Sequence, residues 1–402
     1  MVFFEDEGHK HLHPLTLTRP VDDLRIGILK IHEKWLHYLK KSDFTRTVRL
    51  SLKPVFSKNF NDSHQDVLWI NSRYLPEENI IKRIRQLKSG NGISFDGIPV
   101  VVKLPNKESR DKLDQIYPDF SDTPCEPENS GFLLNRVWEL FQHNGEEIEK
   151  DFRLLSAEKS SQHTNTENSI IIKPARVHFG DHAKIDAGVI LDATEGPIYV
   201  GPNVNIMSGS IIKGPAAICD EAVIKMGAKI YPNTTIGPAC KVGGEVKNVI
   251  FQGFSNKVHE GFVGNSLIGE WCNLGAGTNT SNLKNNYKPN YLINWETGKH
   301  YETGVEYCGT IMGDHSKTGI NTMLNTGTIC GVACNLFSSR FTPKIIPSFS
   351  WIGDDGVDVH HFDKAMETAE RAMEHRNIIL TDNYRAMMQS IFNKYQSKPE
   401  RL

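Results

Sequence analysis

The stretch VGPNVNIMSGSIIKGPAAICDEAVIKMGAKIYPNTTIGPACKV (200–242) decides the fold. An aliphatic residue recurs in it at every sixth position: Val200, Ile206, Ile212, Ile218, Ile224, Ile230, Ile236 and Val242. A small or β-branched residue stands four positions after each of the first seven: Val204, Ser210, Ala216, Ala222, Ala228, Thr234 and Cys240. Neither the 3.6-residue period of a helix nor the two-residue period of a strand gives a strict period of six. A coil with three six-residue sides does, so the repeat predicts a parallel β-helix.

The same period marks the extent of the coil. It begins less regularly near Ile170, lapses after Val242 and resumes at Ile268 and Leu274. A long excursion rich in Asn, Tyr and Lys follows, roughly Thr280 to Thr310. A third run then uses Met312, Thr318, Leu324, Cys330 and Leu336. We therefore expect one coil over 170–352, with a projecting loop and with function where the repeat breaks.

Different patterns flank the coil. Residues 1–155 alternate strand-like and helix-like segments, which predicts an α/β domain. The polar stretch 156–169 has no periodic apolar residue and is interpreted as a linker. In 353–402, Phe362, Met366, Ala369 and Met373 share one helical face, so we expect a helical cap over the open end of the coil.

The composition excludes several classes of protein. The 46 basic and 48 acidic residues nearly balance, which argues against a nucleic-acid partner bound through neutralised phosphates. No stretch reaches the roughly 18 apolar residues of a membrane span. The opening MVFFEDEGHKHLH does not fit a signal peptide, because its apolar run is short and acids follow at once. Seven cysteines without a CxxC motif favour reduced core thiols in a cytoplasmic protein.

The main interruption of the repeat carries polar side chains suited to acyl transfer. It reads VGGEVKNVIFQGFSNKVHEGFVGNSLIGEWCNLGAGTNTSN (242–282) and contains His259, Asn273 and Asn282. Transfer of an acyl group to an amine needs a base for the amine proton and donors for the substrate and the oxyanion. A neutral imidazole suits the first task, and amides and a lysine suit the second. A lone loop histidine is more often a surface or hydrogen-bonded residue, so these residues alone do not establish a function.

The motifs EVK (245–247), HEGFVG (259–264) and IGEWCNLGAGTNTSN (268–282) carry a family resemblance. They resemble the acetyltransferase half of the bifunctional glucosamine-1-phosphate acetyltransferase / N-acetylglucosamine-1-phosphate uridylyltransferase family. The resemblance implies a left-handed β-helix that forms a homotrimer and uses acetyl-CoA. It places His259 as the catalytic base, Lys247 at the sugar phosphate, Asn273 and Asn282 at the sugar, and Ala276 beside acetyl-CoA.

The match departs from the family at several positions. Phe262 stands where the family has a tyrosine, so a hydroxyl partner for the phosphate is lost. The family's arginine has only weak counterparts in Lys225 and Lys241. The excursion is longer than the family's, and the lysine expected there is assigned to Lys288 only as a guess. These departures make the acceptor less certain than the reaction type.

The stretch HPLTLTRPVDDLRIGIL (13–29) resembles the start of sugar-phosphate nucleotidyltransferases through its PLTLTRP core. The family's glycine-rich phosphate cradle is replaced by Glu7-Gly8-His9-Lys10-His11. Arg19, Arg25 and Lys30 are the basic residues available for a nucleotide or sugar phosphate. Asp22 and Asp23 are candidate Mg²⁺ ligands, although an acidic pair at a helix start explains them equally well.

We therefore predict an acetyl-CoA-dependent N-acetyltransferase acting on an amino-sugar phosphate resembling glucosamine-1-phosphate. Nucleotidyl transfer by the N-terminal domain, with Mg²⁺ and a nucleoside triphosphate, is a possible second activity. One alternative is a sugar-1-phosphate nucleotidyltransferase whose β-helix only trimerises the chain, and another is a trimeric β-helix without catalysis. A zinc carbonic anhydrase needs three converging histidines. His178 and His182 are not one hexad apart, so no metal site is predicted in the coil.

Overall fold

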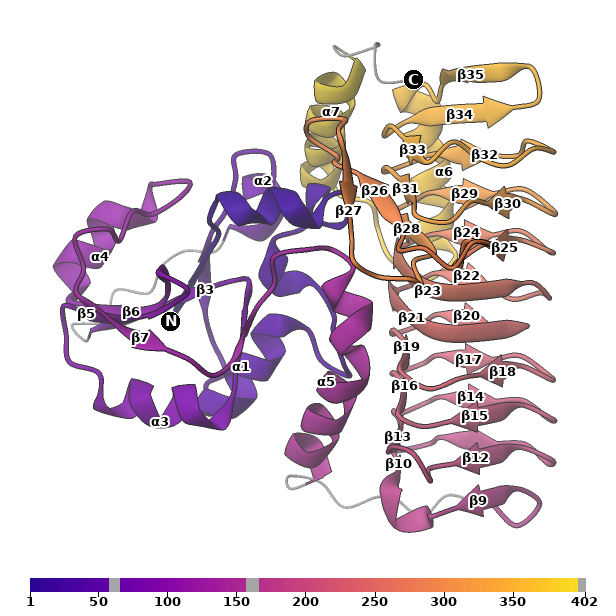
Figure 1. Cartoon of the computed structure of the whole chain (residues 1–402), viewed down its shortest axis with the longest axis horizontal. Helices are drawn as coiled ribbons and strands as arrows, with labels where there is room; N and C mark the ends of the chain where they lie inside the picture. The colour runs from indigo at the N-terminus through magenta and orange to yellow at the C-terminus, as the bar shows by residue number, and fades with distance from the viewer. Residues whose placement is uncertain (58–65, 157–165, 397–402) are drawn as a thin grey trace. The chain divides into compact units, whose positions relative to one another are not determined.

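The computed structural model describes residues 1–57, 66–156 and 166–396 (Figure 1). The chain divides into two compact units. The first unit comprises Met1–Leu24, Leu29–Val137 and Asp382–Ser390, and the second comprises Arg25–Ile28, Trp138–Thr381 and Ile391–Leu402. Most of the predicted linker 156–169 lies outside the described residues.

The first unit is the predicted α/β domain, and it is built on a six-stranded mixed sheet. Its strand order is β2 (Thr45–Thr47), β1 (Val2–Phe4), β3 (Val67–Asn71), β6 (Ile98–Leu104), β5 (Asn91–Phe95) and β7 (Cys125–Glu128). A separate pair joins β4 (Tyr74–Leu75) to β8 (Phe132–Leu133). The α-helices are α1 (Ile31–Leu39), α2 (Lys53–Phe56), α3 (Glu78–Gln86) and α4 (Asn106–Leu113). Short 3₁₀ turns are η1 (Glu7–Leu12), η2 (Leu15–Leu17) and η3 (Val21–Asp23).

Local sequence explains the elements of this sheet. The predicted hairpin over 92–104 is β5–β6, and its turn residues Asp96 and Gly97 both have positive φ, at 49° and 77°. Such a turn matches the twist of the paired strands. Burial of Val2, Phe4, Trp69 and Val102 forms one core cluster on the sheet.

The second unit is the predicted parallel β-helix, with three sides visited in turn. Side one contains β9 (Ile170–Ile172), β12 (Ile190–Asp192), β15 (Ile211–Lys213), β18 (Lys229–Ile230), the starts of β21 (Glu245–Gly253) and β23 (Phe262–Glu270), β25 (Asn279–Thr280) and β30 (Met323–Leu324). Side two contains β10 (Val177–Phe179), β13 (Ile198–Val200), β16 (Ala216–Ile218), β19 (Thr234–Ile236), the ends of β21 and β23, β28 (Thr310–Met312), β31 (Thr328–Cys330) and β33 (Ile345–Ile346). Side three contains β11 (Lys184–Ile185), β14 (Asn205–Ile206), β17 (Val223–Ile224), β20 (Lys241–Val242), β22 (Asn256–Lys257), β24 (Asn273–Leu274), β29 (Lys317–Thr318), β32 (Asn335–Leu336) and β34 (Ser350–Gly353). The turn η4 (Pro174–Arg176) lies in the first coil.

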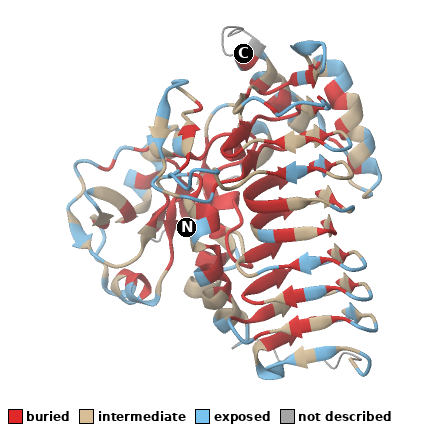
Figure 2. Cartoon of the chain, turned by 45° about the vertical axis from the view of Figure 1, so that its right-hand side comes forward, coloured by how far each residue is buried: buried red, intermediate tan, exposed pale blue. Residues whose placement is uncertain are grey.

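The hexad residues fill the interior of the coil. In side three, for example, Ile206 pairs with Ile224, which pairs with Val242. All eight residues of the ladder are buried, none above 2% exposed. Figure 2 shows buried residues along the strands of the coil and exposed residues at its corners. The stacked aliphatic side chains therefore hold neighbouring coils together by burial of apolar surface.

The segments around the coil differ from expectation in two respects. Helix α5 (Glu139–Ser156) belongs to the coil's unit, where it packs along β16, β19, β21 and β23, so this unit begins before the predicted boundary at 155. The predicted tail helices are α6 (Phe362–Glu374) and α7 (Asp382–Gln396). Phe362 contacts Phe349 at a ring-centroid distance of 6.3 Å, and Arg376 Nη2 donates to Asn256 Oδ1 at 3.1 Å. Because Asn256 lies several coils before Phe349, α6 runs along a flank of the coil and does not close its end.

The excursion and the end of the coil are both hairpins. β26 (Tyr291–Ile293) pairs with β27 (His300–Glu302) inside the excursion, and β35 (Gly356–Val359) pairs back onto β34. Among the described residues, no helix has both the length and the apolar character needed to cross a bilayer.

Candidate functional site

The breaks in the repeat meet at the corner between sides one and two. The excursion leaves the coil after Asn282 and returns at Cys308, whose amide donates to the Asn282 carbonyl at 2.8 Å. Leu283 and Tyr307 form an isolated antiparallel bridge at the same place. A cavity of about 390 Å³ opens at this corner, lined by Glu195, Lys213, Tyr231, Pro232, Asn233, Lys247, Asn248, Asn265 and Tyr307.

Four asparagines stack at this corner, one per coil, and are called here the asparagine ladder: Asn233, Asn248, Asn265 and Asn282. Asn282 Nδ2 donates to Asn265 Oδ1 at 2.8 Å. With the Asn248 amide oriented to satisfy its neighbours, Asn265 Nδ2 donates to Asn248 Oδ1 at 3.1 Å, and Asn248 Nδ2 reaches the Asn233 carbonyl at 3.3 Å. The first three have positive φ, between 46° and 62°, which asparagine tolerates better than most residues. The ladder thus fixes the side chain of Asn282 from beneath.

The structure brings Lys247, Phe262 and Asn282 together. Lys247 is exposed, lines the cavity and lies opposite Gly264 in the pairing of β21 with β23. A Cβ atom on Gly264 would lie 2.4 Å from the Phe262 ring and 2.7 Å from Asn282 Nδ2. Both side chains therefore rest on the bare backbone of Gly264, which only glycine leaves open to them.

His259 and Ala276 lie at a different corner, between sides three and one. His259 is exposed. Ala276 follows one coil later, where the Gly277 amide donates to the Glu260 carbonyl at 2.9 Å. Side one separates this corner from Lys247. Asn273 is exposed on side three, in register between Asn256 and Lys317. Within one chain the predicted residues thus form two groups at the two edges of side one, with Asn273 apart from both.

Sequence reasoning missed the asparagine ladder and the tyrosines of the cavity, Tyr231 and Tyr307. A signal for the ladder exists, because Asn248, Asn265 and Asn282 are spaced 17 residues apart, close to one turn of the coil. No comparable signal exists for Tyr307, because the path of the excursion does not follow the period.

The N-terminal candidates are largely engaged in ion pairs. Asp23 Oδ2 lies 2.9 Å from Lys30 Nζ and 3.7 Å from Arg19 Nη1, and Asp22 Oδ2 lies 2.6 Å from Arg46 Nε. Burial alone would raise the pKa of the Asp23 carboxyl, but Lys30, Arg19 and Arg46 outweigh it and hold that pKa well below its usual value. The two carboxylates are thus already neutralised by cations of the chain.

Arg25 belongs to a different unit from Arg19 and Lys30, the residues with which the sequence interpretation grouped it. It belongs to the second unit, where its amide donates to Gln252 Oε1 at 2.7 Å and its guanidinium donates to the Ile28 carbonyl. The neighbouring Gly27 carbonyl accepts from Thr235 Oγ1 at 2.8 Å. Arg25 therefore helps to hold its own short segment on the coil.

The side chain of Arg73 occupies the loop that follows β1. Arg73 forms a bidentate pair with Asp6, at 2.7 and 2.6 Å, and is 3% exposed. A Cβ atom on Gly8 would lie 2.4 Å from its guanidinium carbon. Burial lowers the pKa of His9 to about 3, so its ring is neutral. A phosphate cradle needs open backbone N–H groups and unpaired positive charge. In this loop the Gly8 amide donates to Asp6 Oδ1 at 3.0 Å, and the Arg73 guanidinium is paired with Asp6.

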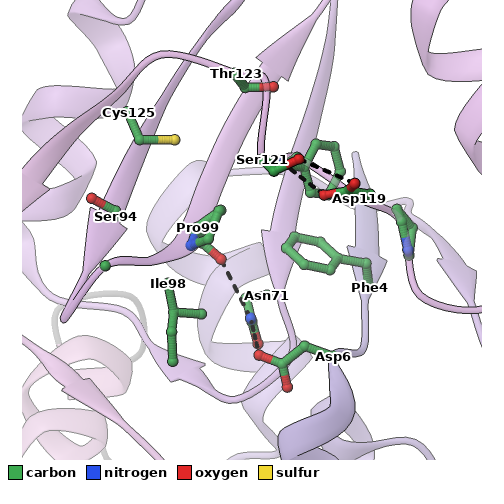
Figure 3. Close-up of a pocket in the computed structure, with 13 residues that line it drawn as sticks. Phe4, Asp6, Asn71, Ser94, Ile98, Pro99, Asp119, Ser121, Thr123 and Cys125 are labelled. Atoms are coloured by element: carbon green, nitrogen blue, oxygen red, sulfur yellow. Dashed lines mark hydrogen bonds between the residues drawn. The ribbon is translucent and has the colours of Figure 1, made fainter.

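A second cavity, of about 460 Å³, lies in the first unit beside the carboxyl ends of β1 and β3 (Figure 3). Open α/β sheets commonly bind ligands at such ends. Phe4, Phe120 and Asn71 line it, and the Asn71 amide donates to Asp6 Oδ2 at 2.9 Å. Of the described residues that line it, none is lysine or arginine. Elsewhere in the described chain, no three His, Cys, Asp or Glu side chains are grouped closely enough to hold a metal ion.

Part of the chain matches a known protein family. Residues 1–160 match the model of a family described as sugar nucleotidyl transferase. Over 173 residues the chain is 27% identical to the bifunctional protein GlmU of Synechococcus sp. (strain CC9311), covering 42% of this chain and 33% of that protein. It is 34% identical over 131 residues to GlmU of Methanocaldococcus jannaschii, covering 33% of this chain and 30% of that protein. The resemblance inferred from the motifs is thereby confirmed.

Two further similarities are to proteins described as acyl-group transferases. The chain is 29% identical over 144 residues to a putative uncharacterized acetyltransferase, YaiX, of Escherichia coli (strain K12), covering 35% of this chain and 61% of that protein. A crystal structure of a UDP-N-acetylglucosamine acyltransferase aligns with 59% of this chain and 80% of its own, at 11% identity and a TM-score of 0.34. The chain spans about a third of the length of the GlmU relatives compared above.

Proposed function

We propose that the coil is an acetyl-CoA-dependent N-acetyltransferase whose acceptor is an amino-sugar phosphate resembling glucosamine-1-phosphate. The observation that carries this proposal is the convergence of Lys247, Phe262 and Asn282 on Gly264 at the rim of the corner cavity. An exposed ammonium beside fixed amides suits a phosphorylated sugar. The similarity to GlmU proteins and to YaiX supports the same reaction class.

The chain's own residues would act as follows. Acetyl-CoA supplies an acetyl thioester. Lys247 binds the acceptor phosphate, and Asn282, held by Asn265, orients the sugar hydroxyls. His259 accepts the proton that the amine loses as it bonds to the acetyl carbon, and it returns this proton to the thiolate of coenzyme A that leaves when the C–S bond breaks. Phe262 offers no hydroxyl, so the phosphate has one hydrogen bond fewer than in the family pattern.

The separation of His259 from Lys247 suggests how the site is completed. We infer that the corner bearing Lys247 in one subunit meets the corner bearing His259 and Ala276 in the next, within a homotrimer. In a cyclic trimer each such interface repeats three times, so each trimer would hold three sites. This arrangement unites the two groups without any change in the fold of the single chain.

The acceptor cavity has features of its own. Tyr307 arrives from the excursion, and Lys213 is paired with Glu195, so Lys247 is the lysine available to a ligand. Lys288 is exposed in the excursion and does not line the cavity. We infer that Tyr231 and Tyr307 select the acceptor by packing on its ring.

Nucleotidyl transfer by the first unit is the second candidate, favoured by the family match of residues 1–160. The residues present do not fit Mg²⁺ and a nucleoside triphosphate, because Asp22 and Asp23 are ion-paired and Arg73 fills the loop after β1. The cavity of Figure 3 is better suited to an uncharged ring than to a polyanion.

A thiol-release assay tests the proposal. Acetyl-CoA would be offered with amino sugars that carry or lack a 1-phosphate, to wild type and to His259→Ala. We expect release with the phosphorylated acceptor, reduced about 10²–10⁴-fold by His259→Ala. A wild-type rate in His259→Ala would remove the histidine from the mechanism, and silence of the wild type with every acceptor would remove the reaction.

A further inference from the structure

A lysine lies inside the coil. Lys257 occupies an inward position on β22, in register with Val242 of the preceding coil, and is 1% exposed. The next coil places Leu274 there, directly after the residue that pairs with Asn256. An ammonium in an apolar interior is costly unless hydrogen-bond acceptors surround it. The local structure around Lys257 must therefore offer hydrogen-bond acceptors to its ammonium.

An unusual corner of the coil provides this local structure. The corners that follow β11, β14, β17, β22, β24 and β29 each contain four residues, but the corner after β20 contains only Gly243 and Gly244. This shortening also ends the six-residue ladder, because the inward residue after Val242 is Val246. A short corner leaves room beside the full corner of the next coil, and that next corner, 258–261, carries His259.

The ammonium of Lys257 occupies this room. It donates to the carbonyl of His259. A Cβ atom on Gly244 would lie 2.9 Å from the carbonyl oxygens of His259 and Gly261 and 3.0 Å from Lys257 Nζ. The ammonium and both carbonyls thus gather over the bare backbone of Gly244.

Two other corners of the coil are closed by a hydrogen bond from a side-chain hydroxyl. Ser210 and Thr322, each the fourth residue of its corner, donate their hydroxyls to the first corner carbonyl, at 2.8 and 3.0 Å. Gly261 is the fourth residue of the His259 corner and has no hydroxyl. A side chain cannot be added there, because a Cβ atom would lie 2.2 Å from the Thr278 carbonyl. In this corner the hydrogen bond comes from Lys257, and it reaches the carbonyl of His259, the second corner residue.

We propose that Lys257 is a positioning residue that holds the His259 corner from inside the coil and so fixes the imidazole for proton transfer. The role of the imidazole rests on the proposed function, whereas the anchoring of the corner does not. Misplacement of a catalytic group by about 1 Å costs about 10²-fold in rate. A flexible corner would therefore affect kcat more than KM.

Lys257→Met is the decisive variant, because it keeps the length of the side chain and removes its donor. We expect it to fold with a Tm no lower than wild type, since a buried charge is removed. Its kcat should fall about 10–100-fold with both KM values nearly unchanged. Lys184→Met, the same change at an exposed lysine of β11, should leave kcat as in wild type. A folded Lys257→Met with wild-type kcat would overturn the proposal.

A second measurement separates this proposal from the proposed function. Hydrogen exchange of the Glu245 and Gly277 amides, which donate to the Gly261 and Glu260 carbonyls of this corner, should quicken in Lys257→Met and not in Lys184→Met, whatever the activity. Unchanged exchange at this corner would overturn the anchoring role. If wild type releases no thiol, the proposed function fails, and the exchange result alone decides the role of Lys257.

Discussion

At the scale of single residues, Lys257 couples the stability of the coil to pH. Burial lowers the pKa of its ammonium to about 8, although Glu260 acts in the opposite direction. Below that pH both the folded and the unfolded chain carry the proton. Between about pH 8 and the ordinary lysine pKa near 10.4, the unfolded chain binds a proton that the folded chain has released. The free energy of unfolding attributable to Lys257 therefore rises with pH in this window.

We predict that the difference in unfolding free energy between wild type and Lys257→Met shifts in favour of wild type by about 1–2 kcal/mol between about pH 7.5 and pH 9.5. Urea titration of both proteins at the two pH values measures it. Because both proteins share the other titrating groups, the contributions of those groups to the unfolding free energy cancel in the difference. A difference that does not change with pH would mean that the ammonium keeps its ordinary pKa.

The sequence could predict the identities of most candidate residues but not their grouping. Motif spacing identified Lys247, Phe262 and Asn282, and the structure brings them together. It could not reveal that His259 lies across side one from them, because the two-residue corner at Gly243–Gly244 and the continuous strands β21 and β23 interrupt the count of six. Arg25 was grouped with Arg19 by proximity in sequence, although the chain passes to the other unit between them.

At the scale of elements, the hexad period determines which face of each short strand is inside. Ile211 and Ile212 are adjacent on β15, yet Ile211 is 45% exposed and Ile212 is fully buried. Successive side chains of a strand point to opposite faces, which explains this difference. On side two the outward residues, such as Ala217 and Thr235, are buried as well. The period therefore predicted the coil and its core, and the excursion was predicted from the loss of the period.

The position of α5 was not predictable in this way. Its apolar stripe shows that one face is buried, but a stripe does not name the partner. The partner depends on contacts such as that of Asn144, which donates to Thr235 Oγ1 at 3.0 Å and accepts from the Gly27 amide at 2.8 Å. Contacts between residues so far apart in sequence leave no local pattern.

A matched pair of substitutions tests the inward and outward faces. Ile224→Ala should lower the free energy of unfolding by about 2–5 kcal/mol, because it opens a cavity in the core of the coil. Ile211→Ala makes the same chemical change on an exposed face and should stay within about 0.5 kcal/mol of wild type. Denaturant titrations of the two variants compare them directly, and equal losses would contradict the assignment of faces.

At the scale of the whole molecule, the candidate site is divided between two edges of one coil. A monomer with this division would hold its base and its phosphate-binding lysine apart. We therefore expect sedimentation to give a particle of three times the 45.3 kDa chain mass. A monomer in solution with full activity would show that one chain completes the site.

Mixing inactive variants tests the same division chemically. Lys247→Ala and His259→Ala should each be inactive alone, but trimers reassembled from an equal mixture should recover about a quarter of the wild-type sites, since one site of every mixed trimer receives both intact residues. Thiol release before and after reassembly measures the recovery. Absence of recovery, with mixed trimers demonstrated by mass, would place both residues in the same subunit's site.

The excursion also has a consequence for the order in which the molecule folds. Along the regular coil a strand pairs with another 18 residues away, as Val200 does with Ile218, so growth can begin at several places and spread from neighbour to neighbour. Across the excursion the corresponding partners, Leu267 and Ile311, are 44 residues apart. Closing that longer loop costs only about 0.8 kcal/mol more in chain entropy, but we expect these two partners to find each other more slowly than partners within the regular coil. We expect two stacks to grow separately and to join at this seam, so that the corner with Asn282 and Tyr307 takes shape last.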